Sequence, residues 1–91
     1  MPAVLRLEVL HRDQGCVGFR RLPGPCGSPL EIDHVRASGG LGLKSRTTAD
    51  NLVVLCRTHH RYKTEHGREV RPLLLDYLSR WYPVELAEVM E

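Results

Sequence analysis

The chain has 91 residues and a formal net charge of +2; 42% of its residues are hydrophobic and 26% are charged. This length predicts one small domain, and the composition is too apolar for a disordered protein. The longest apolar runs, residues 52–55 and 73–75, are far shorter than the ~20 residues that cross a bilayer. Because no signal peptide is evident either, we expect a cytoplasmic protein without a membrane segment.

Helix and strand patterns can be assigned through the first half of the chain. The spacing of apolar residues predicts a helix over residues 3–12, which ends at Gln14. Residues 15–29, called the knuckle below, are rich in glycine and proline and hold a cysteine near each end. Such a segment has no core of its own and needs an external tie. Alternation predicts a strand over residues 30–35, and a return strand is expected at 43–48 after a glycine-rich loop.

A second helix is predicted in the middle of the chain. Asp50 or Asn51 is a good N-cap for a helix that includes residues 52–63. Gly67 is suited to the position just after the last turn of this helix, because glycine adopts the left-handed backbone found there. This predicted helix therefore includes most of the candidate functional residues.

A third helix follows at about residues 70–82, with Pro72 in its first turn and Pro83 at its end. The whole chain, residues 1–91, is thus expected to form a single domain with both helices and strands. Its order is helix, knuckle, hairpin, helix, helix.

Basic residues are concentrated in the middle of the chain. Residues 36–71 carry eight basic and three acidic side chains, whereas residues 72–91 carry one basic and four acidic. A basic segment suits a phosphate-binding surface. On charge alone, a solvated surface of mixed charge is an equal alternative.

The first group of chemically reactive residues comprises Cys16, Cys26, Cys56 and His59. On a helix, Cys56 and His59 lie one turn apart on one face, and the other two cysteines bracket the knuckle. Four such ligands suit a tetrahedral structural zinc, which would supply folding free energy that a small core lacks. The alternative is three free cysteines, which are commonly buried, and a surface histidine.

The second group comprises Asp33, His34, Asn51, His60 and Lys63. Neighbouring strand residues point to opposite faces, so Asp33 and His34 need a bend or a strand end to share a site. His59 and His60 lie about 100° apart on a helix. One imidazole can therefore face the zinc while the other faces a second metal.

Five segments carry a resemblance to a known family: Arg12-Asp13 with Gly15 and Cys16, residues 31–35, Gly39-Gly40, residues 51–56, and His59-His60 with Lys63. In this order and at these spacings the chain resembles the HNH endonucleases of the ββα-metal (His-Me finger) type. The resemblance covers about residues 7–66 and extends to the small, free-standing, phage-like members. It implies an α+β fold, namely a small ββα-metal (HNH) domain with a zinc-stapled knuckle and flanking helices.

The resemblance also implies roles for individual residues. His34 matches the general base, Asp33 and His60 match the ligands of one catalytic divalent metal, and Asn51 matches the residue that orients the hairpin and loop. The structural zinc set would be Cys16, Cys26, Cys56 and His59. The first cysteine pair is spread by a nine-residue insertion, and His59 stands where relatives have a fourth cysteine. These departures leave open a swapped register in which His60 binds zinc and His59 the catalytic metal.

The activity implied is hydrolysis of DNA phosphodiester bonds, by nicking or cleavage, with weak sequence specificity. The mixed nitrogen and oxygen ligands admit Mg²⁺, Mn²⁺, Ni²⁺, Co²⁺ or Zn²⁺. Arg57, Arg61 and Lys63 are candidates for holding the DNA backbone, and solvated helix charges are their alternative. Two other functions stay open: a zinc-stapled DNA-binding module without cleavage, and an accessory module that works with phage DNA-packaging proteins in the host cytoplasm.

Overall fold

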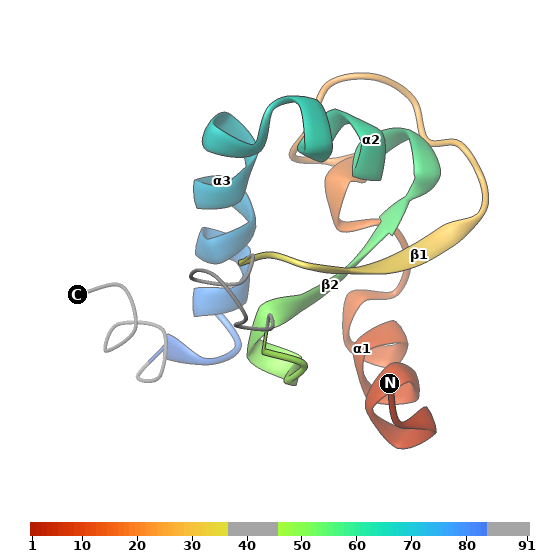
Figure 1. The fold of residues 1–91 in the computed structure, drawn as a ribbon, viewed down its shortest axis with the longest axis vertical. Coiled ribbons are helices and arrows are strands. Elements are labelled where there is room, and N and C mark those ends of the chain that lie inside the picture. Colours follow the sequence, from red (N-terminus) through yellow and green to blue (C-terminus); the bar gives the residue numbers. More distant parts are fainter. Residues whose placement is uncertain (37–45, 84–91) are drawn as a thin grey trace, which may run out of the picture.

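The computed structural model describes residues 1–36 and 46–83. Its elements in chain order are α1 (Ala3–Asp13), the 3₁₀ turn η1 (Val17–Phe19), β1 (Leu30–His34), the 3₁₀ turn η2 (Ala49–Asn51), β2 (Leu52–Cys56), α2 (Arg57–Glu65) and α3 (Gly67–Ser79). The two strands cross the centre of the molecule, with α2 above them, α3 along one side and α1 at the opposite end (Figure 1). The described part of the chain thus confirms the expected combination of helices and a hairpin. None of its helices is both long and apolar enough to cross a membrane.

The hairpin is antiparallel, and its register places Leu30 opposite Cys56 and His34 opposite Leu52. The predicted strand at 30–35 is therefore confirmed, but the prediction of the segment that pairs with it is wrong. The return strand was expected at 43–48, of which 43–45 lie outside the described residues and 46–48 are not in a strand. The partner is β2, which directly precedes α2.

The prediction that residues 52–56 open a helix is wrong, and so is the N-cap at Asp50 or Asn51. All five residues of β2 are buried. A strand covered on both faces is apolar throughout rather than alternating, so its pattern cannot be told from a buried helical turn. The helix begins only at Arg57, with Cys56 as its N-cap, and the Cys56 Sγ accepts a hydrogen bond from the His59 backbone N–H.

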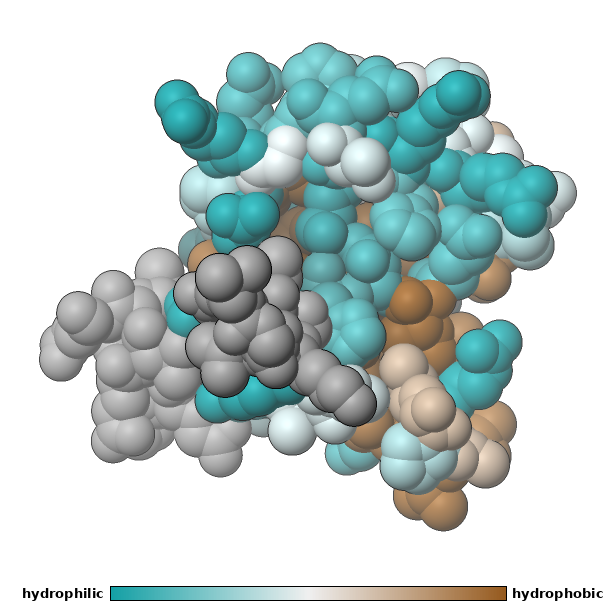
Figure 2. All heavy atoms as spheres, in the orientation of Figure 1, coloured by the Kyte–Doolittle hydropathy of each residue, from teal (hydrophilic) through white to brown (hydrophobic). Residues whose placement is uncertain are grey.

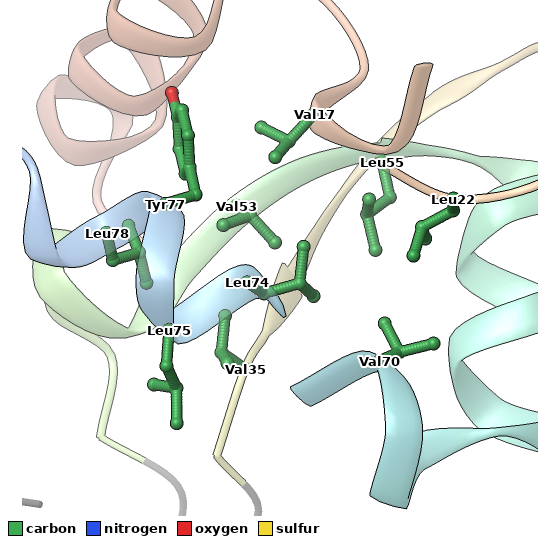
Figure 3. Packing of buried hydrophobic residues seen from close by; sticks show 10 residues of the cluster. All are labelled: Val17, Leu22, Val35, Val53, Leu55, Val70, Leu74, Leu75, Tyr77 and Leu78. Carbon is green, nitrogen blue, oxygen red and sulfur yellow. The ribbon is translucent and has the colours of Figure 1, made fainter. Parts of the chain in front are cut away.

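The two faces of β2 contact different parts of the core. Val53 and Leu55 belong to the larger cluster, while Leu52 and Val54 pack with Val9 of α1. Figure 3 shows the larger cluster, in which side chains of β2 meet residues from η1, the knuckle, the end of β1 and α3. Its buried members are Val17, Leu22, Val35, Val53, Leu55, Val70, Leu74, Leu75, Tyr77 and Leu78.

The three helices begin and end differently from one another. The structure confirms the helix expected at 3–12, and Gln14 ends it in the left-handed conformation at φ 53°. Gly67 was expected to end α2, and this prediction is wrong. Gly67 instead begins α3, which extends to Ser79 with Pro72 inside it. Pro72 has no N–H for the carbonyl of Arg68, and because both residues are exposed, solvent can serve that carbonyl.

A buried ion pair at the end of α1 ties three other elements to this helix. The Arg12 Nε lies 2.6 Å from Asp13 Oδ1, and the Arg12 guanidinium donates to the backbone carbonyls of Ala49 and Leu52 at 2.7 and 2.5 Å. Asp13 accepts from the Val54 N–H at 2.8 Å and from the hydroxyl of Tyr77 at 2.6 Å. The Asp13 side chain is fully buried, so these donors compensate a charge that would otherwise be costly. They also fix β2, and with it Cys56, relative to α1 and α3.

Candidate functional site

Four ligand atoms converge where the knuckle meets the start of α2. Cys16, Cys26, Cys56 and His59 each offer one such atom, and these atoms all lie within 4.8 Å of one another. The three Sγ atoms lie 3.3, 3.6 and 3.2 Å from the His59 Nδ1. Zinc bond lengths of ~2.3 Å to sulfur and ~2.0–2.1 Å to nitrogen give a tetrahedral edge of ~3.6 Å. The cluster can therefore hold a metal ion such as zinc with little movement.

The ring of His59 is held so that one nitrogen is left for a metal. Its Nε2 lies 3.2 Å from the Pro23 carbonyl and 3.0 Å from the Gly24 carbonyl, so Nε2 carries the proton and donates. Nδ1, which faces the cysteines, then has a free lone pair. The same two carbonyls tie the middle of the knuckle to α2, which is the external tie that its sequence requires.

Two of the thiols, Cys56 and Cys26, differ in acidity. Burial alone would raise the pKa of the Cys56 thiol, but the backbone N–H groups of His59 and Gly27, with the neighbouring thiols, lower it to about 7. Loss of hydration, with the hydrogen bonds to the Cys56 and Cys16 thiols, raises the pKa of Cys26 to about 12. The Cys56 thiol therefore loses its proton more readily than the Cys26 thiol. A metal bound at Cys26 would have to displace that proton.

Gly18 gives a stability prediction for this cluster. A Cβ added at Gly18 would lie 2.9 Å from the Cβ and Cγ of His59. We expect Gly18→Ala to displace the ring, to destabilise the fold by about 1–3 kcal/mol and to speed loss of the metal to a chelator. Thermal unfolding and chelator competition measure both effects. Gly67→Ala is the matched control, because its nearest contact would be 3.8 Å away; equal unfolding and metal loss in both variants would contradict the prediction.

The neighbouring histidine points to another group of residues. His60 lies between two acidic side chains of β1, with its Nδ1 2.9 Å from Glu31 Oε1 and its Nε2 3.3 Å from Asp33 Oδ1. Only the first contact has the geometry of a hydrogen bond. Asp33 Oδ1 and His60 Nε2 are therefore adjacent without being bonded to each other. This is the arrangement in which two side chains can bind the same ion.

Lys63, one turn after His60 on α2, contacts the same group of residues. Its Nζ lies 2.7 Å from Asp33 Oδ2 and donates to the His34 carbonyl at 2.9 Å. Its side chain is only 15% exposed. The structure thus places Lys63 as a tie between α2 and the end of β1.

His34 and Asn51 lie at the end of the hairpin. The His34 Nε2 lies 3.0 Å from the Thr47 hydroxyl. The Asn51 side chain accepts from the Arg36 N–H at 2.9 Å and donates to the Arg36 and Arg46 carbonyls at 3.3 and 2.8 Å. Asn51 is 3% exposed, so its amide holds together the two chain segments that flank residues 37–45.

Two arginines on the exposed side of α2 lie near Glu31 and His60. The side chains of Arg57 and Arg61 are 68% and 83% exposed, and Arg57 Nε lies 3.8 Å from Glu31 Oε2. Both residues line a shallow pocket together with Glu31, His60 and Thr64. The surface over α2 is hydrophilic, whereas apolar side chains gather over α1 (Figure 2). The basic residues expected at a nucleic-acid interface therefore lie beside His60.

Glu31 lies within the motif segment 31–35, but the resemblance implies no role for it. The signal that could have found it is the period of a strand, because Glu31 and Asp33 are two residues apart and share a face. Comparisons of the chain with protein-family models, with curated proteins and with solved structures find no match.

Proposed function

We propose that this protein is a divalent-metal-dependent DNA endonuclease of the HNH type, stabilised by a zinc ion on Cys16, Cys26, Cys56 and His59. The observation that carries the proposal is the pairing of Asp33 Oδ1 with His60 Nε2 at 3.3 Å, without a hydrogen bond between them. The order β1, β2, α2 gives this pair the ββα framework that the motif implies. The two neighbouring histidines of α2 serve two different groups of ligands, which accounts for the His-His pair.

Asp33 and His60 would hold the catalytic cation, and two protein ligands leave coordination positions for water and for a phosphate oxygen. When bound, this cation stabilises negative charge on the scissile phosphate and on the leaving oxygen. Lys63 keeps the Asp33 carboxylate directed toward α2 through the contact at 2.7 Å. Its bond to the His34 carbonyl ties the end of β1 to the same helix turn.

His34 would take the proton of the attacking water. A neutral imidazole accepts a proton near pH 7, because its ordinary pKa is ~6.5. The contact of Nε2 with the Thr47 hydroxyl fixes the orientation of the ring. Asn51 supports this geometry by joining the backbone on both sides of residues 37–45.

The DNA would lie along the exposed side of α2. Arg57 and Arg61 project from the hydrophilic surface beside His60, and exposed arginines bind phosphate groups with two parallel hydrogen bonds. No recognition helix is evident beyond the motif in the described residues, so contacts to the phosphate backbone would dominate. We therefore expect weak sequence specificity and binding that weakens as the salt concentration rises.

Incubation of supercoiled plasmid with the purified protein across Mg²⁺, Mn²⁺, Co²⁺, Ni²⁺ and Zn²⁺ tests the proposal. We expect nicked or linear DNA with at least one of these ions and intact plasmid when none is added, because Asp33 and His60 need a cation to act on phosphate. Agarose gels measure the cleavage, and end-labelling should show 5′-phosphate ends, which the resemblance to HNH endonucleases implies. Plasmid that is bound but intact with every ion would contradict the endonuclease and favour the zinc-stapled binding or packaging module.

A further inference from the structure

Glu31 contacts the side of His60 that faces away from Asp33. Glu31 Oε1 lies 2.9 Å from His60 Nδ1 with hydrogen-bond geometry. A carboxylate only accepts, so the hydrogen of this bond belongs to Nδ1. In the neutral ring the proton on Nδ1 leaves the lone pair on Nε2, which is the nitrogen next to Asp33 Oδ1.

Glu31 does not itself complete the ligand group of Asp33 and His60. Among the described residues, the only set of three or more side chains whose ligand atoms lie within 4.8 Å of one another is the cluster of cysteines and His59. The carboxylates of Glu31 and Asp33 therefore approach the imidazole from different sides. Glu31 is placed to act on His60 rather than on the ion.

The two histidines of α2 are held in opposite tautomers. His59 donates from Nε2 to the Pro23 and Gly24 carbonyls and turns Nδ1 to the thiols. His60 donates from Nδ1 to Glu31 and turns Nε2 to Asp33. In each case an acceptor outside the ligand group decides which nitrogen is free, and such partners orient metal-binding imidazoles in general.

Glu31 is in turn held from the helix side. Arg57 Nε lies 3.8 Å from Glu31 Oε2, so one carboxylate oxygen faces the arginine while the other bonds to His60. The Glu31 side chain is 33% exposed, and it shares a pocket with Arg57, His60 and Arg61. The carboxylate thus has defined contacts on both oxygens.

We propose that Glu31 is a positioning residue that holds His60 in the Nδ1–H tautomer and so presents Nε2, beside Asp33, to a divalent cation. The inference rests on the proposed function for the identity of the site. The hydrogen bond itself is a property of the protein without DNA and without a cation at Asp33 and His60. It can therefore be measured separately from cleavage.

Long-range ¹⁵N–¹H correlation spectra of the purified protein, recorded at a pH where the imidazole is neutral, test the tautomer. We expect the proton of His60 on Nδ1 in the wild type and in Glu31→Gln, whose amide oxygen still accepts. Glu31→Leu removes the acceptor and should lose this preference. Glu65→Leu is the matched control, because Glu65 is an exposed acid on α2 that contacts Arg61, with Oε1 3.6 Å from Nε.

Mn²⁺ binding, followed by the electron paramagnetic resonance of the free ion, gives a second readout. This hard cation prefers oxygen and imidazole ligands to thiolates. We expect Glu31→Leu to bind it about 10–100-fold more weakly than the wild type, with Glu31→Gln and Glu65→Leu close to the wild type. Thermal unfolding of each variant shows whether the fold is retained, and the Glu31→Gln comparison holds even if Glu31→Leu unfolds.

A wild-type His60 protonated on Nε2 would overturn the inference, as would a folded Glu31→Leu with unchanged tautomer and Mn²⁺ affinity. A Glu31→Gln variant that loses both properties would also overturn it, since the acceptor is retained. Loss of the endonuclease proposal gives a different result. In that case the tautomer and Mn²⁺ binding follow Glu31 as expected, but plasmid stays intact with every cation.

Discussion

Replacement of Cys56 by serine should remove most of the stability of this domain. Cys56 is buried at the junction of β2 and α2, and its Sγ lies 3.2 Å from His59 Nδ1 within the four-ligand cluster. Serine is a preferred N-cap and can still accept the His59 N–H, so the start of α2 keeps its cap. The change therefore removes the metal ligand with little other loss.

The expected loss of stability in Cys56→Ser follows from the coupling of metal binding to folding. Structural zinc contributes roughly 10–16 kcal/mol in small zinc-binding peptides, which is comparable to the ~5–15 kcal/mol that stabilises a whole domain. Thermal unfolding followed by circular dichroism should show a strongly lowered or absent transition in Cys56→Ser. Elemental analysis should find about one zinc per chain in the wild type and far less in the variant, since serine is a poor zinc ligand.

A chelator provides the control for this prediction. Wild type treated with chelator should unfold like untreated Cys56→Ser, and the variant should change little on the same treatment. An unchanged transition in the variant, together with wild-type protein free of zinc, would show that the cysteines are only buried thiols. The fold would then depend on the apolar core and on the Arg12–Asp13 ion pair.

His34→Ala is expected to lower the DNA cleavage rate by about 10²–10⁴-fold, the range that a positioned general base contributes. His34 is the last residue of β1, and its imidazole makes an exposed contact with the Thr47 hydroxyl. Its backbone carbonyl, which accepts from Lys63, is present in alanine as well. The unfolding transition and the affinity for DNA should therefore stay close to those of the wild type.

Plasmid cleavage rates, a DNA-binding titration without added divalent cation and thermal unfolding together separate catalysis from binding and stability. His11→Ala is a matched control, because His11 lies on the exposed surface of α1. It should cleave at the wild-type rate. Cleavage by His34→Ala at the wild-type rate would remove His34 from the role of base, and a matching loss of stability would assign its effect to folding.

Local patterns in the chain were enough to predict much of this protein. The period of the apolar residues located α1, alternation located β1, and the spacing of Cys56 and His59 predicted that they face one ligand site together with Cys16 and Cys26. These features depend on residues close in sequence or on ligand types with few alternative uses. The sequence favoured His59 as the partner of the cysteines and left the exchange with His60 open, and the geometry places His59 there.

The tertiary structure alone decided what residues 52–56 form and that Glu31 joins Asp33 beside His60. A fully apolar run is compatible with a strand or a helix, and it becomes β2 because β1 pairs with it while α1 and α3 cover its two faces. This shift also moves the start of α2 to Arg57. His60 then faces Glu31 and Asp33, because only the hairpin register places these two carboxylates next to the first turn of the helix. Such contacts between distant segments are set by packing, which no local pattern records.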